Sequence, residues 1–291
     1  MVADRLAQVV RQQLGLGRLL PLGDAADGAW LVETAAVTTL RAAVSLALPN
    51  VRLGSVRIAP AIPEATDPPT VPAPPSALPP GPMRLEADFA VTADAPLTAV
   101  AERLRTALLS AAGQELGLRV TSADLRVTDL LERPDDDAIG ETHDDRHATE
   151  ETAQDSAVTE AGRPQLDANP PAPADYPRAT ATAEAVIAVP GVTRLAPVLG
   201  SGLGGLPPDA VSVTDRRDPE RGRHLQIQIA VAEGTRALDV ARAVRRAAAK
   251  AAAWDAPEPT VPVTVAVLVT AIDPAIGSGG ERTEEKTKQT Q

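Results

Sequence analysis

Cysteine is absent from the 291-residue chain, which excludes disulfide bonds, thiolate nucleophiles and zinc sites built on cysteine. Aromatic residues are almost as scarce, with one Phe, one Tyr and two Trp. Any core must therefore consist mainly of Val, Leu, Ile and Ala, which bury less area per side chain than aromatic residues. Because ligand pockets usually draw on aromatic side chains, this composition disfavours an enzyme or a cofactor site.

Long hydrophobic runs are also missing. The longest, VPVTVAVLVTAI at residues 261–272, contains Pro and Thr and is too short for a membrane-spanning helix, so we predict a buried strand. The opening residues MVADRLAQVVRQQLG lack the apolar segment of a signal peptide, and we expect a cytoplasmic protein. No basic groove with interleaved aromatics is present, so nucleic-acid binding is not expected.

The net charge of −11 is concentrated in one segment. Residues 132–160 hold eleven acidic and two basic residues, a local charge of −9, and lead into the Pro-rich sequence RPQLDANPPAPADYP. Such a composition cannot repay the entropy of ordering, so residues 133–174 are predicted to be a disordered spacer. An acidic interaction segment is the alternative. Residues 59–82, with ten prolines, and the polar tail 274–291 are also predicted to be unstructured.

An internal repeat is indicated by a shift of 140 residues, which aligns 84–132 with 224–272. Each segment begins with apolar residues at every second position, continues with apolar residues three and four apart, and ends with alternation again. These periods predict a strand, a helix and a second strand. The first copy carries Leu85, Ala87 and Phe89, then Leu97, Val100, Ala101, Leu104, Leu108 and Ala111, then Ala123, Leu125 and Val127; the second carries Leu225, Ile227 and Ile229, then Ala237, Val240, Ala241, Val244, Ala247 and Ala251, then Val263, Val265 and Val267.

A second correspondence lies upstream at an offset of 141, where Pro49-Asn50-Val51 matches Pro190-Gly191-Val192 after an apolar helical run. Each copy is therefore predicted to be a small α+β domain in the order helix, strand, variable loop, strand, helix, strand. The variable loop is 59–82 in the first copy and the sequence SGLGGLPPDA in the second. We predict a first domain at 1–132, including an N-terminal helix, and a second, degenerate domain at 175–273.

The residue pattern resembles the alkaline shock (envelope stress response) family. Gly28, Trp30 and Val32 match the family's opening Gly-x-apolar-x-apolar, Ala36, Val37 and Leu40 fall on its helix, and Asn50-Val51 stands at the spacing of its Gly-Val. The stretch from Gly117 to Val127 looks like its closing Gly-Leu and apolar strand. The family's Tyr-Gly before the second helix is Asp94-Ala95 here and Gly234-Thr235 in the second copy.

The resemblance implies a non-enzymatic protein of stress response or cell-envelope homeostasis, which self-associates or is recruited by a membrane-anchored protein. It implies no catalytic residue, cofactor or metal. A self-contained pseudo-dimer that binds an unknown ligand is the alternative. An enzyme is the third and least favoured class.

Several residues match functional motifs, and each has a simpler interpretation. Gly200, Gly202 and Gly205 satisfy the dinucleotide fingerprint, but Pro207-Pro208 follow where a helix must begin, which favours a loop. His143 and His147 have metal-ligand spacing but lie in the predicted spacer without further ligands. His224 has no evident catalytic partner in sequence, so we expect a surface residue.

Two charged or amphipathic segments also have two interpretations each. Arg242, Arg245 and Arg246 line one side of a predicted helix, and we interpret them as a solvated face rather than a phosphate site. Leu6, Val9, Val10 and Leu14, followed by Leu16, Leu19, Leu20 and Leu22, are interpreted as packing on the first domain. A partner-docking or membrane-surface helix is the alternative there.

Overall fold

A computed structural model describes residues 17–92, 95–131, 176–197, 210–216, 222–254 and 262–274. Within these ranges the protein is a mixed α+β structure with four α-helices and two β-sheets, which confirms the predicted fold class. The predicted spacer at 133–174 and most of the tail at 274–291 lie outside the described residues.

The first sheet has three strands in the order β3-β4-β5. Strands β3 and β4 are antiparallel neighbours, whereas β4 and β5 run parallel and are joined by a crossover through a helix. The elements are α2 (Glu33–Ala47), β3 (Val51–Pro60), β4 (Met83–Thr92), α3 (Leu97–Ser110), its π-helical continuation η1 (Ala111–Leu116) and β5 (Val120–Leu131). Apolar residues at intervals of three and four explain both helices, because their buried side chains fall on one stripe.

The second sheet has six strands in the order β1-β2-β9-β8-β6, with β7 also pairing with β8. Its elements are β1 (Leu19–Leu22), β2 (Ala29–Val32), α4 (Tyr176–Ile187), β6 (Val192–Leu195), β7 (Val211–Arg216), β8 (Gly222–Ala232), α5 (Ala237–Trp254) and β9 (Val263–Asp273). Strands β8 and β9 are parallel and joined through α5, as β4 and β5 are joined through α3. The apolar residues at 19, 20 and 22 thus form a strand.

Strand β2 joins the two halves of the chain. It directly precedes α2 in the sequence, but it pairs in parallel with β9, where Trp30 lies opposite Leu268 and Leu31 opposite Val269. The Val267 N–H also donates to the Gly28 carbonyl oxygen at 2.9 Å. A strand from the N-terminal half therefore completes the edge of the C-terminal sheet.

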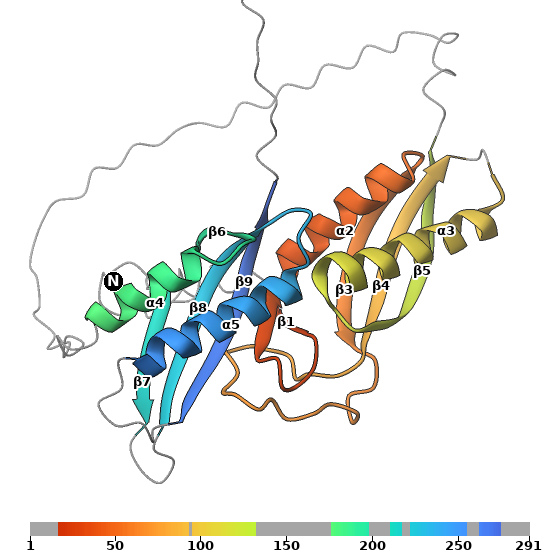
Figure 1. Cartoon of the computed structure of the whole chain (residues 1–291). Coiled ribbons are helices and arrows are strands. Elements are labelled where there is room, and N and C mark those ends of the chain that lie inside the picture. Colours follow the sequence, from red (N-terminus) through yellow and green to blue (C-terminus); the bar gives the residue numbers. More distant parts are fainter. Residues whose placement is uncertain are drawn as a thin grey trace, which may run out of the picture.

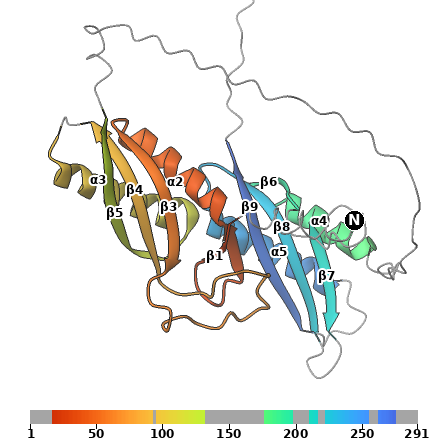
Figure 2. The same ribbon diagram turned by 180° about the vertical axis from the view of Figure 1, so that it is seen from behind.

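All four α-helices lie on one side of the two sheets, which stand next to each other (Figure 1). The view from behind shows the opposite sheet faces and the long connection between β3 and β4, which crosses below β1 (Figure 2). The hydrophobic cluster beneath the helices is continuous, since it contains Leu40, Leu104 and Phe89 of the N-terminal half together with Val244 and Ile229 of the other half. This larger of the two hydrophobic clusters therefore spans both halves of the chain.

The Pro-rich connection at 61–82 covers part of the rear face of the second sheet. Val71 and Ala77 pack with Leu19, Trp30 and Leu268 in a separate apolar cluster, and Trp30 is only 1% exposed. The Leu78 N–H donates to the Leu19 oxygen at 2.9 Å, and the Trp30 indole N–H donates to the Leu78 oxygen at 3.3 Å. The prediction of an unstructured segment was wrong here, because proline prevents ladder formation but not apolar packing.

The two parallel strand pairs share one irregularity. The β4–β5 register shifts after Phe89, and the β8–β9 register shifts after Ile229, so one residue of each partner strand is left as a bulge. Those residues are Thr128 and Thr270, and each hydroxyl donates to the facing carbonyl, to Phe89 at 3.3 Å and to Ile229 at 3.2 Å. The two sheets thus match in detail as well as in strand direction.

The predicted alignment of the last strand was wrong by two residues. Leu85 lies opposite Ala123, and its counterpart Leu225 lies opposite Val265, so β5 and β9 correspond at an offset of 142. A shift of two leaves an alternating pattern in phase, and therefore the sequence pattern could not detect it. The variable loops also lie between different strands: residues 61–82 separate β3 from β4, whereas residues 196–210 separate β6 from β7.

Gly117 is required where the two halves meet. It ends η1 with a left-handed φ of 86°, and a Cβ atom at this position would lie 2.4 Å from Cβ of Leu238 on α5. Leu238 is 3% exposed and belongs to the continuous core. Both the backbone conformation and the close approach of α5 therefore select glycine.

We predict that Gly117→Ala lowers the free energy of unfolding by about 2–4 kcal/mol, because alanine disfavours positive φ and overpacks the contact with Leu238. Urea unfolding monitored by circular dichroism measures the change. Gly113→Ala is the matched control, since a Cβ there meets nothing within 4 Å. The control should be neutral or stabilising by about 0.5–1 kcal/mol, and equal losses in the two variants would contradict the assigned packing.

Candidate functional site at the junction of the two halves

Several of the polar contacts that cross between the halves converge on the loop at 23–28, which connects β1 to β2. Asp27 accepts two hydrogen bonds from Arg242 of α5, from Nε at 2.7 Å and from Nη2 at 2.9 Å. Arg245, one turn further along α5, donates to the Ala26 carbonyl oxygen. Asp24 forms an ion pair with Arg119, which lies just before β5. The loop is therefore held from both sides.

The Asp27 carboxyl group is ionised because of these contacts. Its partial burial opposes ionisation, but the hydrogen bonds from Arg242 and from the Asp24 N–H, with the charges of Arg242 and Arg245, outweigh that cost and hold the pKa below its ordinary value. The side chain of Asp27 is 13% exposed, which limits screening by water. In the same way, the hydrogen bonds that Arg242 donates to Asp27 raise the pKa of Arg242.

A second, partly buried contact fixes the start of α2. Glu33 is the first residue of the helix. Its carboxylate accepts a hydrogen bond from Arg18 Nη2 at 2.9 Å and another from the Arg18 backbone N–H at 3.1 Å. The same Nη2 donates to the Ile58 oxygen of β3 at 2.7 Å. Burial opposes ionisation of Glu33, but the contacts with Arg18 prevail and lower its pKa. Strands β1 and β3 are thus tied together through one helix terminus.

These ionised groups are matched by protein partners. Among the described residues, no buried side-chain nitrogen or oxygen lacks a hydrogen bond, and no group of three or more His, Asp or Glu could hold a metal ion. Asp27 uses both oxygens on Arg242, which gives the pair a structural role. None of the helices in the described ranges is long and apolar enough to cross a membrane.

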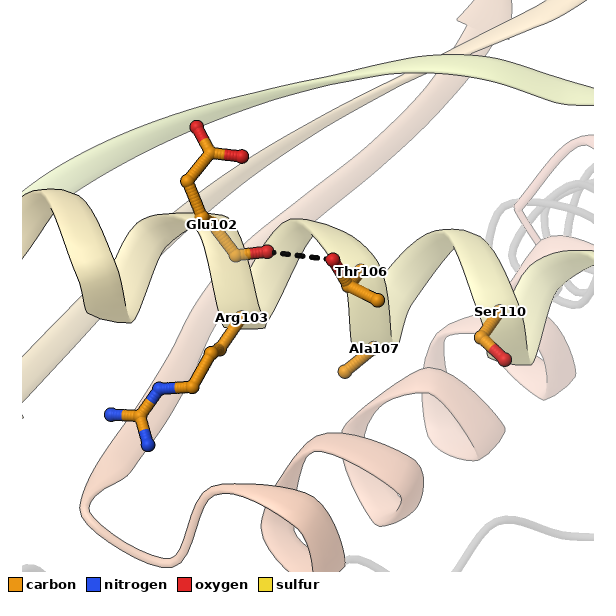
Figure 3. Close-up of a pocket in the computed structure, with 5 residues that line it drawn as sticks. All are labelled: Glu102, Arg103, Thr106, Ala107 and Ser110. Carbon is orange, nitrogen blue, oxygen red and sulfur yellow. Dashed lines mark hydrogen bonds between the residues drawn. The ribbon is translucent and has the colours of Figure 1, made fainter.

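The hollow on the surface of α3 does not provide an active site. Five residues line it, all from this one helix: Glu102, Arg103, Thr106, Ala107 and Ser110. The Thr106 hydroxyl donates to the backbone oxygen of Glu102 at 2.9 Å, and the side chains spread along the helix rather than toward a common point (Figure 3). Reactive sites need groups that converge from several directions, which is not the case here.

The residues singled out in the sequence are not brought together by the fold. His224 lies on β8, where its Nδ1 is 3.0 Å from the Thr264 hydroxyl of β9, so it takes part in a cross-strand contact. Of the arginines interpreted as a solvated face, Arg246 is exposed, whereas Arg242 and Arg245 are partly buried and bind the loop at 23–28. The predicted motif residues outside the described ranges are Leu6, Val9, Val10, Leu14, Leu16, His143, His147, Gly200, Gly202, Gly205, Pro207 and Pro208.

Sequence reasoning missed Asp27 and the loop that carries it. The only local signal is the sequence GDAADG at 23–28, in which both bounding glycines adopt positive φ. A Cβ at Gly28 would lie 2.7 Å from Val71 of the Pro-rich connection. The pattern identifies a tight loop, but it does not reveal that the partner of Asp27 lies 215 residues further along the chain.

No family model, curated protein or solved structure matches this chain.

We predict that Asp27→Asn lowers the free energy of unfolding at pH 7 by about 1–2 kcal/mol, because it removes the charge partner of Arg242. The pKa of Asp27 is depressed in the folded state, so its contribution is present above the unfolded pKa of about 3.9 and is lost as pH falls through the folded value. The two proteins should therefore converge in stability as pH falls below the folded-state pKa of Asp27. Urea unfolding between pH 2.5 and pH 7 measures this.

Asp239→Asn serves as the matched control. Asp239 also pairs with Arg242, at 3.7 Å, but its side chain is 58% exposed. Exposed pairs contribute little, so the control should change stability by less than about 0.5 kcal/mol. A pH-independent difference between Asp27→Asn and the unmodified protein would contradict the assigned role of the ionised carboxylate.

Proposed function

We propose that this chain is a non-enzymatic scaffold of stress response or cell-envelope homeostasis that acts through protein–protein contacts. We place it with the alkaline shock family as a two-copy member, working in the cytoplasm close to the membrane. It associates with itself or with a membrane-anchored protein. The observation that carries the proposal is a mixed α+β structure whose two sheets each contain a parallel strand pair joined through a helix, and in which the described buried polar groups are all taken by structural contacts.

The matching details of the two sheets support the two-copy interpretation. Besides the paired Thr128 and Thr270 bulges, the Thr92 N–H donates to the Asn50 oxygen at 3.2 Å, and the Ala232 N–H donates to the Gly191 oxygen at 2.9 Å. These equivalent contacts stand at the offsets of 140 and 141 found in the sequence. Independent sheets have no reason to repeat such irregularities at the same offsets.

The same details bear on the family assignment. Gly28 has a φ of 56° and immediately precedes β2, whose four residues lead directly into α2. This matches the order of Gly, apolar strand and amphipathic helix on which the resemblance is based. Because that order carries no reactive residue, it supports a role in binding rather than in catalysis.

A self-contained pseudo-dimeric binding module is the second candidate, and the pairing of β2 with β9 favours it. That pairing satisfies one sheet edge within the chain, so the two halves need no external partner to stay together. The two candidates differ in what is bound: the scaffold presents its remaining surfaces to other proteins, whereas the module holds a ligand between its halves.

Crosslinking mass spectrometry on the full chain in living cells tests the proposal. We expect crosslinks between copies of the chain, or to a membrane-anchored protein, that increase under envelope stress. A chain with six residues in place of 133–174 is a useful comparison, because a pure spacer can be shortened without loss of these crosslinks. Absence of any protein crosslink, together with a small molecule that co-purifies at equal stoichiometry, would favour the ligand-binding module and contradict the scaffold.

A further inference from the structure

The sheet edges differ in how they are protected. Unpaired strand edges invite pairing with other chains, and proteins usually cover or distort them. At β1, Leu78 of the Pro-rich connection donates to the Leu19 oxygen. At β3, a bulge between Leu53 and Val56 distorts the edge. Arg18 and Arg41 also donate hydrogen bonds to the carbonyl oxygens of Ile58 and Gly54 on this strand. Strands β6 and β7 are short, with four and six residues.

Strand β5 differs from the other edge strands. It has twelve residues, pairs only with β4 among the described strands, and forms the outer edge of its sheet (Figure 2). Its register is interrupted near Thr121 and at Thr128, so the stretch from Ser122 to Val127 is regular. This stretch contains no proline or lysine, which commonly protect an edge, and its only charged residues are Asp124 and Arg126.

The corresponding edge of the second sheet, along β9, is covered by another strand. β9 is the counterpart of β5, and β2 pairs along it. Val269 of β9 is fully buried, whereas Val127, at the equivalent position of β5, is 40% exposed, and Leu130 is 54% exposed. In the sequence, the segment before α4 is PPAPAD at 170–175, whose prolines have no N–H to donate and are unsuited to the role that β2 plays for β9.

The backbone groups that β5 presents outward can be assigned. The Ala123 carbonyl oxygen accepts a hydrogen bond at 3.1 Å from Nε of Arg105, a side chain of α3. This oxygen therefore points away from β4. Successive residues of a strand direct their backbone groups to alternate edges, and Leu125 and Val127 therefore face outward with Ala123. A carbonyl oxygen has two lone pairs, so Ala123 can accept another N–H while it keeps Arg105.

We propose that β5 pairs with β5 of a second copy of this chain, antiparallel and centred on Leu125. The N–H and C=O of Leu125 would form two hydrogen bonds with the C=O and N–H of Leu125 in the second copy. Ala123 would form the same pair of hydrogen bonds with Val127 of the second copy. The apolar side chains of this strand then meet on the helix side of the sheet. On the other side, Asp124 of each copy lies directly opposite Arg126 of the other. The inference rests on the proposed self-association and names the surface that performs it.

The charges on the rear side of β5 favour this occupant. Asp124 and Arg126 are both exposed, and neither forms an ion pair within the described part of the chain. The neighbour of Asp124 on β4 is Glu86, a like charge directly opposite, which is unfavourable. Arg126 lies opposite Asp88 on its own β4 without forming an ion pair with it. Arg126 of a second copy would place a cation opposite Asp124, and the twofold symmetry makes this exchange reciprocal.

Single charge reversals test the pairing in the full chain. Asp124→Arg places two arginines opposite each other twice in the dimer, and Arg126→Asp does the same with two aspartates. Each variant alone should raise the dimer dissociation constant by about 10- to 100-fold in sedimentation velocity at low salt. Asp124→Arg should not destabilise the monomer, because the new arginine faces Glu86. Lost association in this variant is therefore distinguishable from unfolding.

Mixing the two variants provides the decisive result. A heterodimer of Asp124→Arg with Arg126→Asp restores opposite charges at both positions, so the mixture should dimerise with an affinity close to that of the unmodified protein. Arg52→Asp is the matched control, since Arg52 is an exposed arginine on β3, at the far edge of the same sheet, opposite the uncharged Ala90. It should leave the dissociation constant unchanged.

Other outcomes would overturn the inference in distinguishable ways. A dimer that is insensitive to both reversals would reject the β5 surface while self-association stands. A strictly monomeric purified chain that still crosslinks to a membrane protein in cells would reject the homodimer and leave the scaffold function in place. A monomer without crosslinks in cells would reject both.

Discussion

The parallel pairing of β2 with β9 is the contact on which the remaining architecture depends. It places a strand from the beginning of the chain at the edge of the last strand, and it brings the loop at 23–28 against α5. Once that loop is in place, Asp27 reaches Arg242 and Gly117 reaches Leu238, and the apolar residues of the two halves close into a single core. A chain with few aromatic residues benefits from this union, because small aliphatic side chains stabilise a core only when many are buried together.

Hydrophobic contacts and ion pairs have different roles at the junction of the two halves. The hydrophobic cluster supplies most of the stabilisation, while the Asp27–Arg242 pair fixes the position of the loop. A paired buried charge adds modest net stability but penalises any arrangement that separates the partners. Glu33 acts similarly at the start of α2, since Arg18 connects it to the Ile58 oxygen of β3. The polar groups therefore specify how the elements meet.

The sequence predicts local structure well and long-range pairing poorly. Alternation at Leu85, Ala87 and Phe89 corresponds to buried residues of β4, and the spacing of four between Val100, Leu104 and Leu108 corresponds to those of α3. Leu97, which the sequence placed on the same helical stripe, is 41% exposed. The register of β9 was missed by two residues because alternation does not change under that shift. The pairing of β2 with β9 was missed because a four-residue apolar strand carries no information about which of two similar sheet edges it joins.

The candidate sites show the same division. Proline content at 59–82 correctly excluded regular structure over most of the segment, but Val71 and Ala77 nevertheless cover Trp30. The arginines of α5 were recognised as a group, yet their acceptors lie more than 200 residues earlier in the chain. Charge and apolar patterns identify which side chains need partners, and only the fold determines which partners they meet.

Amide hydrogen exchange of β9 tests the central claim most directly, because the outer edge of this strand is protected only if β2 is paired with it. The Val267 N–H donates to Gly28 across that pairing. The account predicts that this amide exchanges as slowly as the interior amides of β8 and that both sheets lose protection in one unfolding transition. Rapid exchange at Val267, or separate unfolding of the two sheets, would contradict it.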